Sequence, residues 1–358
     1  MASLDLVAIT DTFLKELQDA AQGKTASLPF IKNPLPHTSI VKNDSPFQVI
    51  VIGGSVCKNA IVRKTATGIS LEFNEEEPQP PFLTEVSFLE FLESKIDPKV
   101  TVVCVNFAYP LKPEFTNNIL DGILLSGSKE NTFGTLVTKP VGKTIAEYLS
   151  KKRTSPLTVT VANDTVCTLL SGRGENEWDS LACGIVGTGV NFAFFSDSTT
   201  AVNLESGNFD GFQASEEMKS IDQNSSYPGT ALFEKETAGA YLYQQFNIRT
   251  SQLNPTSPSL TSTKELSDLL QASPSSDTQL ARELLQKSAQ LIACQIAGIT
   301  KYKNHAMTFV MEGSFFWESS TYKETVEKTI KLLVPDHQVD LIHVTNSPII
   351  GGARLALS

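Results

Sequence analysis

Hydrophobic and polar positions follow two different periods along this chain, and the two periods predict its elements. In residues 4–22 apolar side chains recur every three to four positions, which predicts an amphipathic helix. From Phe47 onward the pattern changes to short apolar runs bounded by glycine, proline or charged residues, which is typical of buried strands. The runs predicted as strands are FQVIVI, CKNAIVRKT, KVTVVCVNF, LTVTVA, ACGIV, FAFF, AVNLE, MTFVME and VDLIHVT.

Helical patterns separate many of these runs, and glycine turns follow several of them. The segment TGISLEFNEEEPQPP alternates at first, and we expect it to break into an acidic, proline-rich loop. Residues 247–278 are rich in Ser, Thr and Pro and predict a surface excursion with one short helix at KELSDLLQA. The predicted helices after residue 22 are LTEVSFLEFLESKI, residues 142–152, 229–246 and 277–300, STYKETVEKTIKLL and the end of IIGGARLAL.

Strands followed by helices, twice over, predict an α/β architecture with mixed sheets. A strand that ends in a glycine turn recurs at Gly53-Gly54, at Gly187–Gly189 and at Gly313. This repetition suggests two similar lobes around a cleft. Ligands of such sheets bind at the strand ends, near the glycine turns.

Composition narrows the class of protein. The chain has 358 residues, which is enough for one large or two ordinary domains. Its net charge is -10 and it has no Lys/Arg cluster, so we expect neither nucleic acid nor a membrane surface as a partner. A small anion remains compatible with this charge, because a glycine turn can bind phosphate locally.

The cysteines and histidines exclude several site chemistries. The four histidines are scattered, so neither a zinc site nor a histidine-based triad is predicted. We also expect no signal peptide and no membrane span. The five cysteines are odd in number and widely spaced, which predicts reduced, buried thiols in a cytoplasmic protein: Cys57, Cys104, Cys167, Cys183 and Cys294.

Candidate chemistry gathers between Leu157 and Phe195. Asp164 directly follows a predicted buried strand and could act as a base, whereas the turn Gly187–Gly189 could offer backbone N–H groups to an anion. Each has a structural alternative. Asp164 could be a helix N-cap, and both this turn and Gly53-Gly54 could be plain hairpin turns.

Eight segments, in order and over nearly the whole chain, resemble the hexokinases of the actin-like ATPase superfamily. The Asn-Asp-Thr turn and the Gly-Thr-Gly-x-Asn turn are the most specific of them. The segments are VIVIGGSVCK, VNFAYP, LLSGSKEN, VANDTVCTLL, GIVGTGVN, VNLESGNF, PGTALFEKETAGAYL and VMEGSFF.

The resemblance implies a two-lobed actin-like ATPase fold (ribonuclease H-like) of the hexokinase type, with mixed sheets and an inter-domain cleft. Under this interpretation, residues 46–165 and 345–358 form a small domain. Residues 1–45 and 166–344 form a large domain.

The resemblance also implies ATP-dependent phosphorylation of a hexose, with glucose as the expected sugar, at its 6-hydroxyl. Asp164 would be the general base, and the cofactors would be ATP and Mg²⁺, with no protein metal ligand. Residues implied to bind the sugar are Asn163, Asn191, Glu205 and Glu234, with Ser128 and Lys129 closing from the small domain. Residues implied to line the ATP phosphates or adenosine are Gly53, Gly54, Ser55, Gly187, Thr188, Gly189, Gly313 and Ser314.

The chain departs from the family pattern at several positions. Val51 replaces an acid before the first glycine pair, Ala108 replaces a sugar-binding serine, and Ala240 replaces a lysine that meets ATP phosphates. Glu312 stands for an aspartate, a milder change.

These departures keep alternatives open. The chain could be a catalytically weak sugar-binding sensor or regulator, or a kinase for another hexose or an amino sugar. Taken alone, Glu205, Glu234 and Lys129 would be ordinary surface residues. The oligomeric state stays open.

Overall fold

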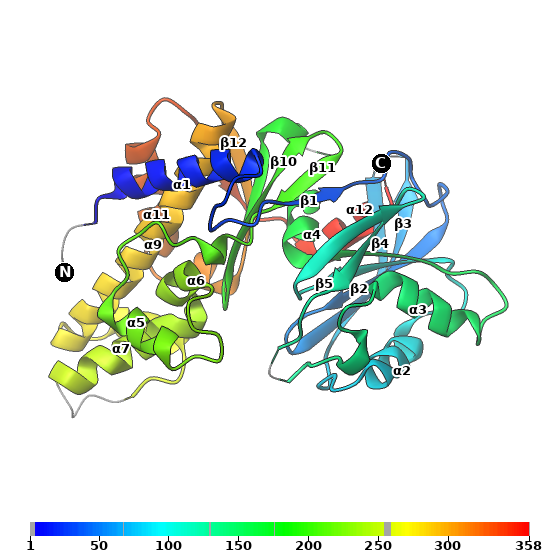
Figure 1. The fold of residues 1–358 in the computed structure, drawn as a ribbon, viewed down its shortest axis with the longest axis horizontal. Coiled ribbons are helices and arrows are strands. Elements are labelled where there is room, and N and C mark those ends of the chain that lie inside the picture. The colour runs from blue at the N-terminus through cyan, green and yellow to red at the C-terminus, as the bar shows by residue number, and fades with distance from the viewer. Residues whose placement is uncertain (1–3, 67, 129, 175, 254–258, 358) are drawn as a thin grey trace. The chain divides into compact units, whose positions relative to one another are not determined.

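The computed structural model describes residues 4–66, 68–128, 130–174, 176–253 and 259–357, which divide into two compact units (Figure 1). Unit 1 contains residues 1–30, 182–192 and 204–342. Unit 2 contains residues 31–181, 193–203 and 343–358. Each unit combines helices with β-strands, as the α/β prediction requires, whereas the predicted domain boundaries stay a prediction.

Unit 2 is built on a five-stranded mixed sheet with the order β4-β3-β2-β5-β8. Strand β5 pairs in parallel with both β2 and β8, while β3 pairs antiparallel with β2 and β4. The strands are β2 (Pro46–Ile52), β3 (Val56–Thr65), β4 (Gly68–Pro78), β5 (Val102–Phe107) and β8 (Thr158–Asn163). All six residues of β5 are buried, which matches the continuous apolar run in its sequence.

Helices cover both faces of this sheet. On one face, α2 (Glu85–Lys95) and α3 (Val141–Ser150) pack with the strands around an apolar core that includes Phe88 and Ile145 (Figure 1). On the other face, α4 (Asp164–Ser171) packs against α12 (Ser347–Arg354). This contact requires Gly351, because a Cβ atom there would lie 1.7 Å from the carbonyl oxygen of Cys167.

The rest of unit 2 consists of short strands and two single-turn helices. Strands β6 and β7 form a separate antiparallel hairpin, and β1 pairs with β11, which in turn pairs with the end of β10. These elements are β1 (Ile31–Pro34), β6 (Leu111–Thr116), β7 (Ile119–Leu124), β10 (Val190–Asp197), β11 (Thr200–Asn203), η1 (Gly134–Leu136) and η2 (Trp178–Ser180). The sequence patterns did not predict β1, β6 or β7.

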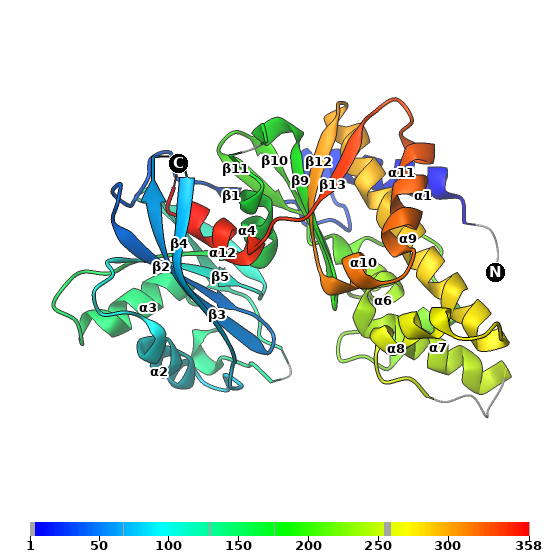
Figure 2. The ribbon, with the colours of Figure 1, turned by 180° about the vertical axis from the view of Figure 1, so that it is seen from behind.

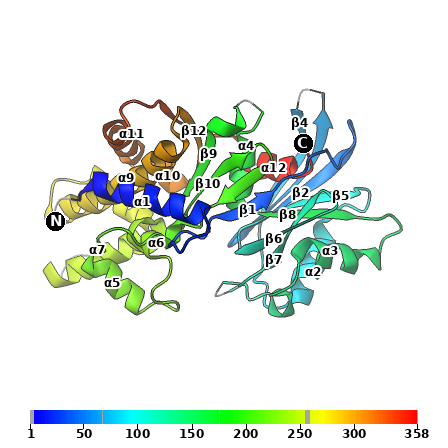
Figure 3. The same ribbon diagram turned by 45° about the horizontal axis from the view of Figure 1, so that its top comes forward.

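Unit 1 combines strands with a layer of long helices. Its strands are β9 (Leu181–Val186), β12 (Met307–Glu312), β13 (Val339–Ile342) and the start of β10, and the complete sheet has the order β1-β11-β10-β9-β12-β13. The helices α1 (Leu6–Ala21) and α11 (Tyr322–Leu333) pack along α9 (Ser276–Lys303), as Figures 2 and 3 show. The predicted helices over residues 4–22 and 277–300 are therefore confirmed.

Shorter helices complete unit 1, and one prediction in this region is wrong. The predicted helix over residues 229–246 is two helices, because Ala238 has an extended backbone and the N–H of Gly239 donates to the carbonyl of Gly187 instead. The short helix predicted at KELSDLLQA is confirmed as α8, and residues 254–258 of this excursion lie outside the described residues. The elements are α5 (Glu216–Gln223), α6 (Leu232–Thr237), α7 (Gly239–Leu253), α8 (Thr263–Asp268), α10 (Ser314–Glu318), η3 (Ser206–Asn208) and η4 (Leu269–Gln271).

Strand β4 differs from its prediction as well. It continues through the acidic segment to Pro78 instead of breaking into a loop. Cross-strand pairing explains this, because Lys58 forms an ion pair with Glu76 at 3.0 Å and Asn59 donates to Glu75 at 3.0 Å. Repulsion between the consecutive carboxylates is thus offset by partners on and beside the neighbouring strand.

The five cysteines are all buried and none forms a disulfide, which confirms their prediction as core thiols. Within the described ranges, no helix has both the length and the apolar content that a bilayer span requires.

Candidate functional site

The carboxyl end of β8 places Asp164 at the first turn of α4. Asn163 is the N-cap, since its Oδ1 accepts a hydrogen bond from the N–H of Thr165 at 3.0 Å. The alternative in which Asp164 is itself the N-cap is therefore wrong. Asp164 is half-buried, and its Oδ1 accepts from the N–H of Thr165 at 2.7 Å and from its hydroxyl at 3.3 Å.

Asn163 has a structural task besides capping. Its Oδ1 also accepts from the side-chain amide of Asn203 at 3.3 Å, and its Nδ2 donates to the carbonyl of Tyr109 at 3.4 Å. The side chain thus ties the end of β8 to the segment that follows β5. This fixes the backbone from which Asp164 projects.

The first glycine loop, Gly53-Gly54-Ser55, closes the hairpin between β2 and β3. The N–H of Gly53 donates to the carbonyl of Val56 at 3.1 Å, so the hairpin-turn geometry is confirmed. Gly54 and Ser55 are exposed. Both properties are compatible with a phosphate-binding role, since an exposed loop tip can approach a ligand with its backbone.

Side chains from three other segments hold this loop in place. The carbonyl of Gly53 accepts from Nε2 of Gln79 at 2.7 Å and from the hydroxyl of Tyr109 at 3.1 Å. The carbonyl of Gly54 accepts from Nδ2 of Asn131 at 3.3 Å. Sequence reasoning assigned none of these three residues a role, although Tyr109 lies in the quoted segment VNFAYP.

Tyr109 joins several candidate segments within unit 2. Burial raises the pKa of its phenol, and hydrogen bonds with Ser128 and Gln79 act in the opposite direction. Ser128 is exposed at this point, so unit 2 brings together Ser128, the Gly53 loop and the cap residue Asn163 through one tyrosine. Lys129, the other residue predicted to close on the sugar, lies outside the described residues.

The position that carries an acid in the family's first loop is hydrocarbon here. Val51 is buried, and its backbone register neighbours are Lys58 on β3 and Asn106 on β5. Among the described residues, no group of three or more His, Cys, Asp or Glu side chains is arranged to hold a metal ion. Val51 itself does not fit a Mg²⁺ ligand, because hard cations need oxygen donors.

In unit 1, Glu234 projects from the first turn of α6 toward the second glycine turn. Its Oε2 accepts from the N–H of Val190 at 3.0 Å. A Cβ atom at Gly189 would lie 2.7 Å from the same oxygen, so a side chain there would make this carboxylate shift. The hairpin geometry expected for Gly187–Gly189 is also confirmed, with the N–H of Gly187 donating to the carbonyl of Gly189 at 3.0 Å.

Asn191 and Glu205 lie beside this carboxylate. Oδ1 of Asn191 accepts from the N–H of Ser206 at 3.1 Å, which connects β10 to the residue after Glu205. Glu205 has the left-handed backbone conformation, with φ of 45°. The adjacent Gly207 contacts Glu234, so unit 1 brings together three of the predicted sugar-binding residues.

Two buried ion pairs hold α6, and neither was predicted. Lys235 pairs with Asp222 at 2.5 Å, and its ammonium also donates to the hydroxyl of Ser225. Glu236 pairs with Lys287 at 2.5 Å. Hydrogen bonding to Lys235 is the main reason why the pKa of Asp222 lies below its usual value. Lys235 and Glu236 directly follow Glu234 on α6, so these pairs fix the helix that presents it.

A pocket of about 390 Å³ in unit 1 is lined by three of the predicted nucleotide residues. Gly187, Thr188 and Ser314 line it, together with Ala240 and the α8 segment around Thr263. Its walls are joined by backbone bonds, since the N–H of Ala240 donates to the carbonyl of Thr188 at 3.2 Å. The Thr263 hydroxyl also donates to the carbonyl of Gly239 at 2.6 Å, a contact that the local pattern of the sequence does not reveal.

Gly313 lies at the same wall and needs its lack of a side chain. Its φ is 118°, and a Cβ atom there would lie 2.3 Å from the carbonyl oxygen of Val186. The turn after β12 can therefore approach the turn after β9 only with glycine at this position. All five residues predicted for this part of the nucleotide site thus lie in one region of unit 1.

Comparison with known proteins finds hexokinases. A family description of hexokinases matches residues 243–358. Hexokinase-1 of Arabidopsis thaliana is 25% identical over 87% of this chain and 79% of its own length. Hexokinase-1 of Spinacia oleracea is 24% identical over 70% of this chain. The chain is similar to hexokinases along most of its length.

Solved structures agree on the hexokinase fold. A hexokinase from Schistosoma mansoni, solved in complex with glucose, superimposes with a TM-score of 0.79 over 99% of this chain and 95% of its own. The sequence identity in that comparison is 17%. The predicted two-lobed actin-like fold of the hexokinase type is therefore confirmed. The chain spans less than two thirds of the spinach relative, whose matched part is 63% of its length.

Proposed function

We propose that this chain belongs to the hexokinase family and is an ATP-dependent hexose kinase that phosphorylates the 6-hydroxyl, with glucose as the expected substrate. The observation that carries the proposal is the position of Asp164 in an Asn-Asp-Thr turn at the carboxyl end of the buried strand β8. The relatives with this fold are hexokinases, and one was solved with glucose bound.

Asp164 acts as the general base in this proposal. Its carboxylate takes the proton of the sugar 6-hydroxyl, and the oxygen then attacks the γ-phosphorus of ATP in line. The bond from that phosphorus to the bridging oxygen of ADP breaks, and ADP leaves with the electron pair. The N-terminal end of α4 supports the role, since helix N–H groups favour a negative charge at its first turn.

Sugar hydroxyls would be recognised by carboxylate and amide groups. Each sugar hydroxyl can both donate and accept a hydrogen bond. The carboxylates of Glu205 and Glu234 can accept from a hydroxyl, and an amide such as that of Asn191 can both donate and accept. The hydrogen bonds from Val190 to Glu234 and from Ser206 to Asn191 hold both side chains in place before a ligand arrives. Such preorganisation lowers the entropy cost of binding.

The nucleotide would bind as MgATP, with its base and ribose in the pocket beside Ser314. Backbone N–H groups around Gly187–Gly189 and Gly53–Ser55 would stabilise the phosphates. Mg²⁺ would enter with the phosphate oxygens, because Val51 offers no ligand. With Ala240 in place of lysine, this chain relies more on backbone donors for the triphosphate.

The test is an assay of ADP release with MgATP and glucose, fructose, mannose or glucosamine, comparing the wild type with Asp164→Asn. We expect sugar-dependent ADP release, and a loss of about 100- to 10,000-fold in the variant, because the base is gone. Asp336→Asn, a change at an exposed position, is the matched control and keeps its rate. Full activity of Asp164→Asn would exclude Asp164 as the base.

A second candidate function is a sugar-binding regulator with little turnover. Val51, Ala108 and Ala240 favour it, because each removes a polar group that the family pattern places at the substrates. If no ADP forms with any sugar of the panel, calorimetric sugar binding by the wild type supports the regulator. The sugar that gives the highest rate decides between a glucose kinase and a kinase for another hexose or an amino sugar.

A further inference from the structure

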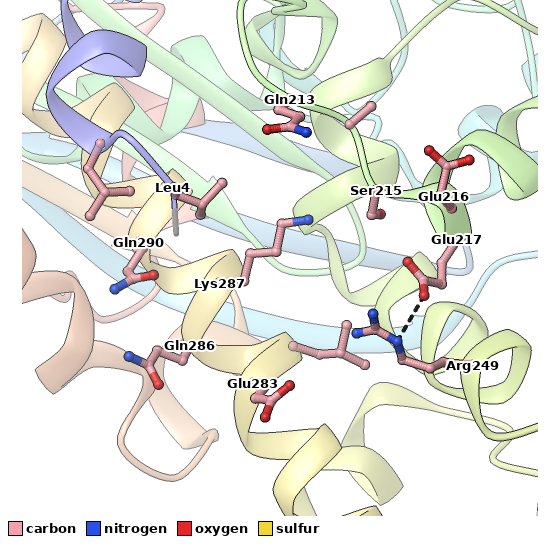
Figure 4. Close-up of a pocket in the computed structure, with 13 residues that line it drawn as sticks. Leu4, Gln213, Ser215, Glu216, Glu217, Arg249, Glu283, Gln286, Lys287 and Gln290 are labelled. Carbon is pink, nitrogen blue, oxygen red and sulfur yellow. Dashed lines mark ion pairs between the residues drawn. The ribbon is translucent and has the colours of Figure 1, made fainter. Parts of the chain in front are cut away.

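A second pocket of about 460 Å³ lies in unit 1, away from every predicted sugar or nucleotide residue (Figure 4). Its walls come from α5, from Arg249 on α7, from α9 and from the segment before α1. Figure 4 shows Glu283, Gln286, Lys287 and Gln290 projecting from α9 at this pocket. The volume falls in the range of small-molecule sites.

Most charged groups of this pocket already have counter-charges. Nε of Arg249 lies 3.0 Å from Oε1 of Glu217, and Nζ of Lys287 lies 2.5 Å from Oε1 of Glu236. Glu283 is the remaining carboxylate that lacks a cationic partner among the described residues, since it accepts only from Gln279. The pocket therefore has no excess of positive charge, which disfavours a nucleotide or a sugar phosphate.

Hydrogen-bonding capacity nevertheless remains at the walls. The Lys287 ammonium has three N–H groups, and Glu236 is its one acceptor among the described residues. Lys287 is held there, since its side chain is only 13% exposed. The side-chain amides of Gln213, Gln286 and Gln290 form no hydrogen bond with any described residue, so each can still donate and accept.

Apolar side chains complete the pocket. Leu4, Leu6 and Leu284 line it beside the amides and ion pairs. A ligand that fits has C–H surface for the leucines and several neutral groups that both donate and accept. Hydroxyl groups on a carbon skeleton have this combination, whereas purely apolar molecules would leave the amides without partners.

We propose that this pocket is a second carbohydrate site, which takes a neutral sugar or polyol. The Lys287 ammonium and the three glutamine amides bind its hydroxyls, and the leucines contact its carbon skeleton. The site differs in position from the residues around Glu234, and it exists whether or not the chain is a kinase.

Methyl NMR of leucine-labelled protein tests this, because Leu284 reports from inside the pocket. We expect D-glucose and sorbitol to shift the Leu284 methyl signals with a Kd on the order of 1 mM, equivalent to about 4 kcal/mol of binding energy. Gln290→Phe fills the pocket and removes these shifts, and Gln213→Phe at its exposed rim provides a second blocking variant. Gln18→Phe, an exposed position on α1 outside the pocket, is the matched control and retains them.

The proposal is overturned if neither sugar nor polyol shifts Leu284, or if the shifts survive in both folded blocking variants. Tighter binding of inorganic phosphate than of D-glucose at Leu284 would also overturn it, since the site would then select anions. Shifts at Leu284 without any ADP release would refute only the kinase proposal. ADP release without these shifts would refute only the second site.

Discussion

Two glycine-tipped hairpins of this protein have similar sequences but are supported differently. The hairpin β2–β3 of unit 2 is held by side chains, with Gln79 and Tyr109 donating to the carbonyl of Gly53. The hairpin β9–β10 of unit 1 is held by one carboxylate, Glu234, and by backbone bonds, with Gly239 donating to the carbonyl of Gly187 at 2.8 Å.

The need for glycine also differs between them. At Gly54 a Cβ atom would meet nothing within 4 Å, whereas at Gly189 it would press on the carboxylate of Glu234. Position 54 therefore tolerates a side chain as far as the protein alone is concerned, whereas a Cβ atom at Gly53 would lie 2.9 Å from the carbonyl oxygen of Val56. At the second loop, a side chain on residue 189 would instead make the Glu234 carboxylate shift. The glycines of the two hairpins thus have different surroundings, and mutations can separate their effects.

Among changes in the two hairpins, the largest effect on activity is expected from Gly189→Ala. The new methyl group would displace Glu234 and weaken its hydrogen bond with the N–H of Val190, a charge-assisted bond worth about 2 kcal/mol. Under the kinase proposal, kcat/KM for the sugar then falls by about 30-fold, at 1.36 kcal/mol per tenfold change. Steady-state kinetics at saturating MgATP measures this, and an unchanged kcat/KM would show that Glu234 does not contact the sugar.

The next effect concerns the helix behind the second hairpin. Asp222→Asn leaves the Lys235 charge buried without its partner, since the Lys235 side chain is 4% exposed, and we expect about 3 kcal/mol of lost stability at neutral pH. Lys235 holds the folded-state pKa of Asp222 below the unfolded value of about 3.9, so the stabilisation is complete above that pH and is lost as pH falls through the folded-state pKa.

Urea unfolding at pH 7 and in acid checks this prediction. The difference between wild type and Asp222→Asn is expected to shrink below about pH 4, where the wild-type carboxyl also becomes protonated. The control is Glu147→Gln, which disrupts an exposed pair with Lys143 and has almost no effect. A deficit of equal size at both pH values would mean that the ion pair is not its cause.

The smallest effect on the folded protein is expected from Gly54→Ala in the first hairpin. Its melting temperature stays unchanged because no atom lies near the new methyl group. If the loop binds phosphate by close backbone approach, KM for ATP rises about 10-fold, corresponding to about 1.4 kcal/mol of lost binding. Wild-type kinetics would instead show that the first loop is only a turn, and the two hairpins would then differ in function as well as in support.

Local patterns predicted most of the strands and the turns between them. Asp164 after β8 and both glycine hairpins are where the apolar runs and their breaks placed them. The patterns failed where distant partners decide the backbone. The predicted helix ends before Gly239 because the N–H of Gly239 donates to the carbonyl of Gly187, more than 50 residues earlier. Strand β4 continues because side chains on and beside β3 pair with its carboxylates.

The residues of the candidate site also divide into those that the sequence indicated and those that only the structure revealed. Resemblance of ordered motifs named Asp164, Glu205, Glu234 and the glycines as candidates, and their assignment to roles stays a prediction. No pattern indicated Tyr109, Asn131 or the buried pairs that hold α6, because each acts through a partner far away in sequence.

The sequence by itself determined the fold class, the strands that end in glycine turns and the resemblance to hexokinases, because these follow from local periodicity and from ordered motifs. Only the tertiary structure decided which side chains support each loop, which carboxylate lies against Gly189 and where a second pocket lies. Those properties depend on distances between residues that are remote in the chain. Close packing and hydrogen bonding set these distances, and a linear pattern does not contain them.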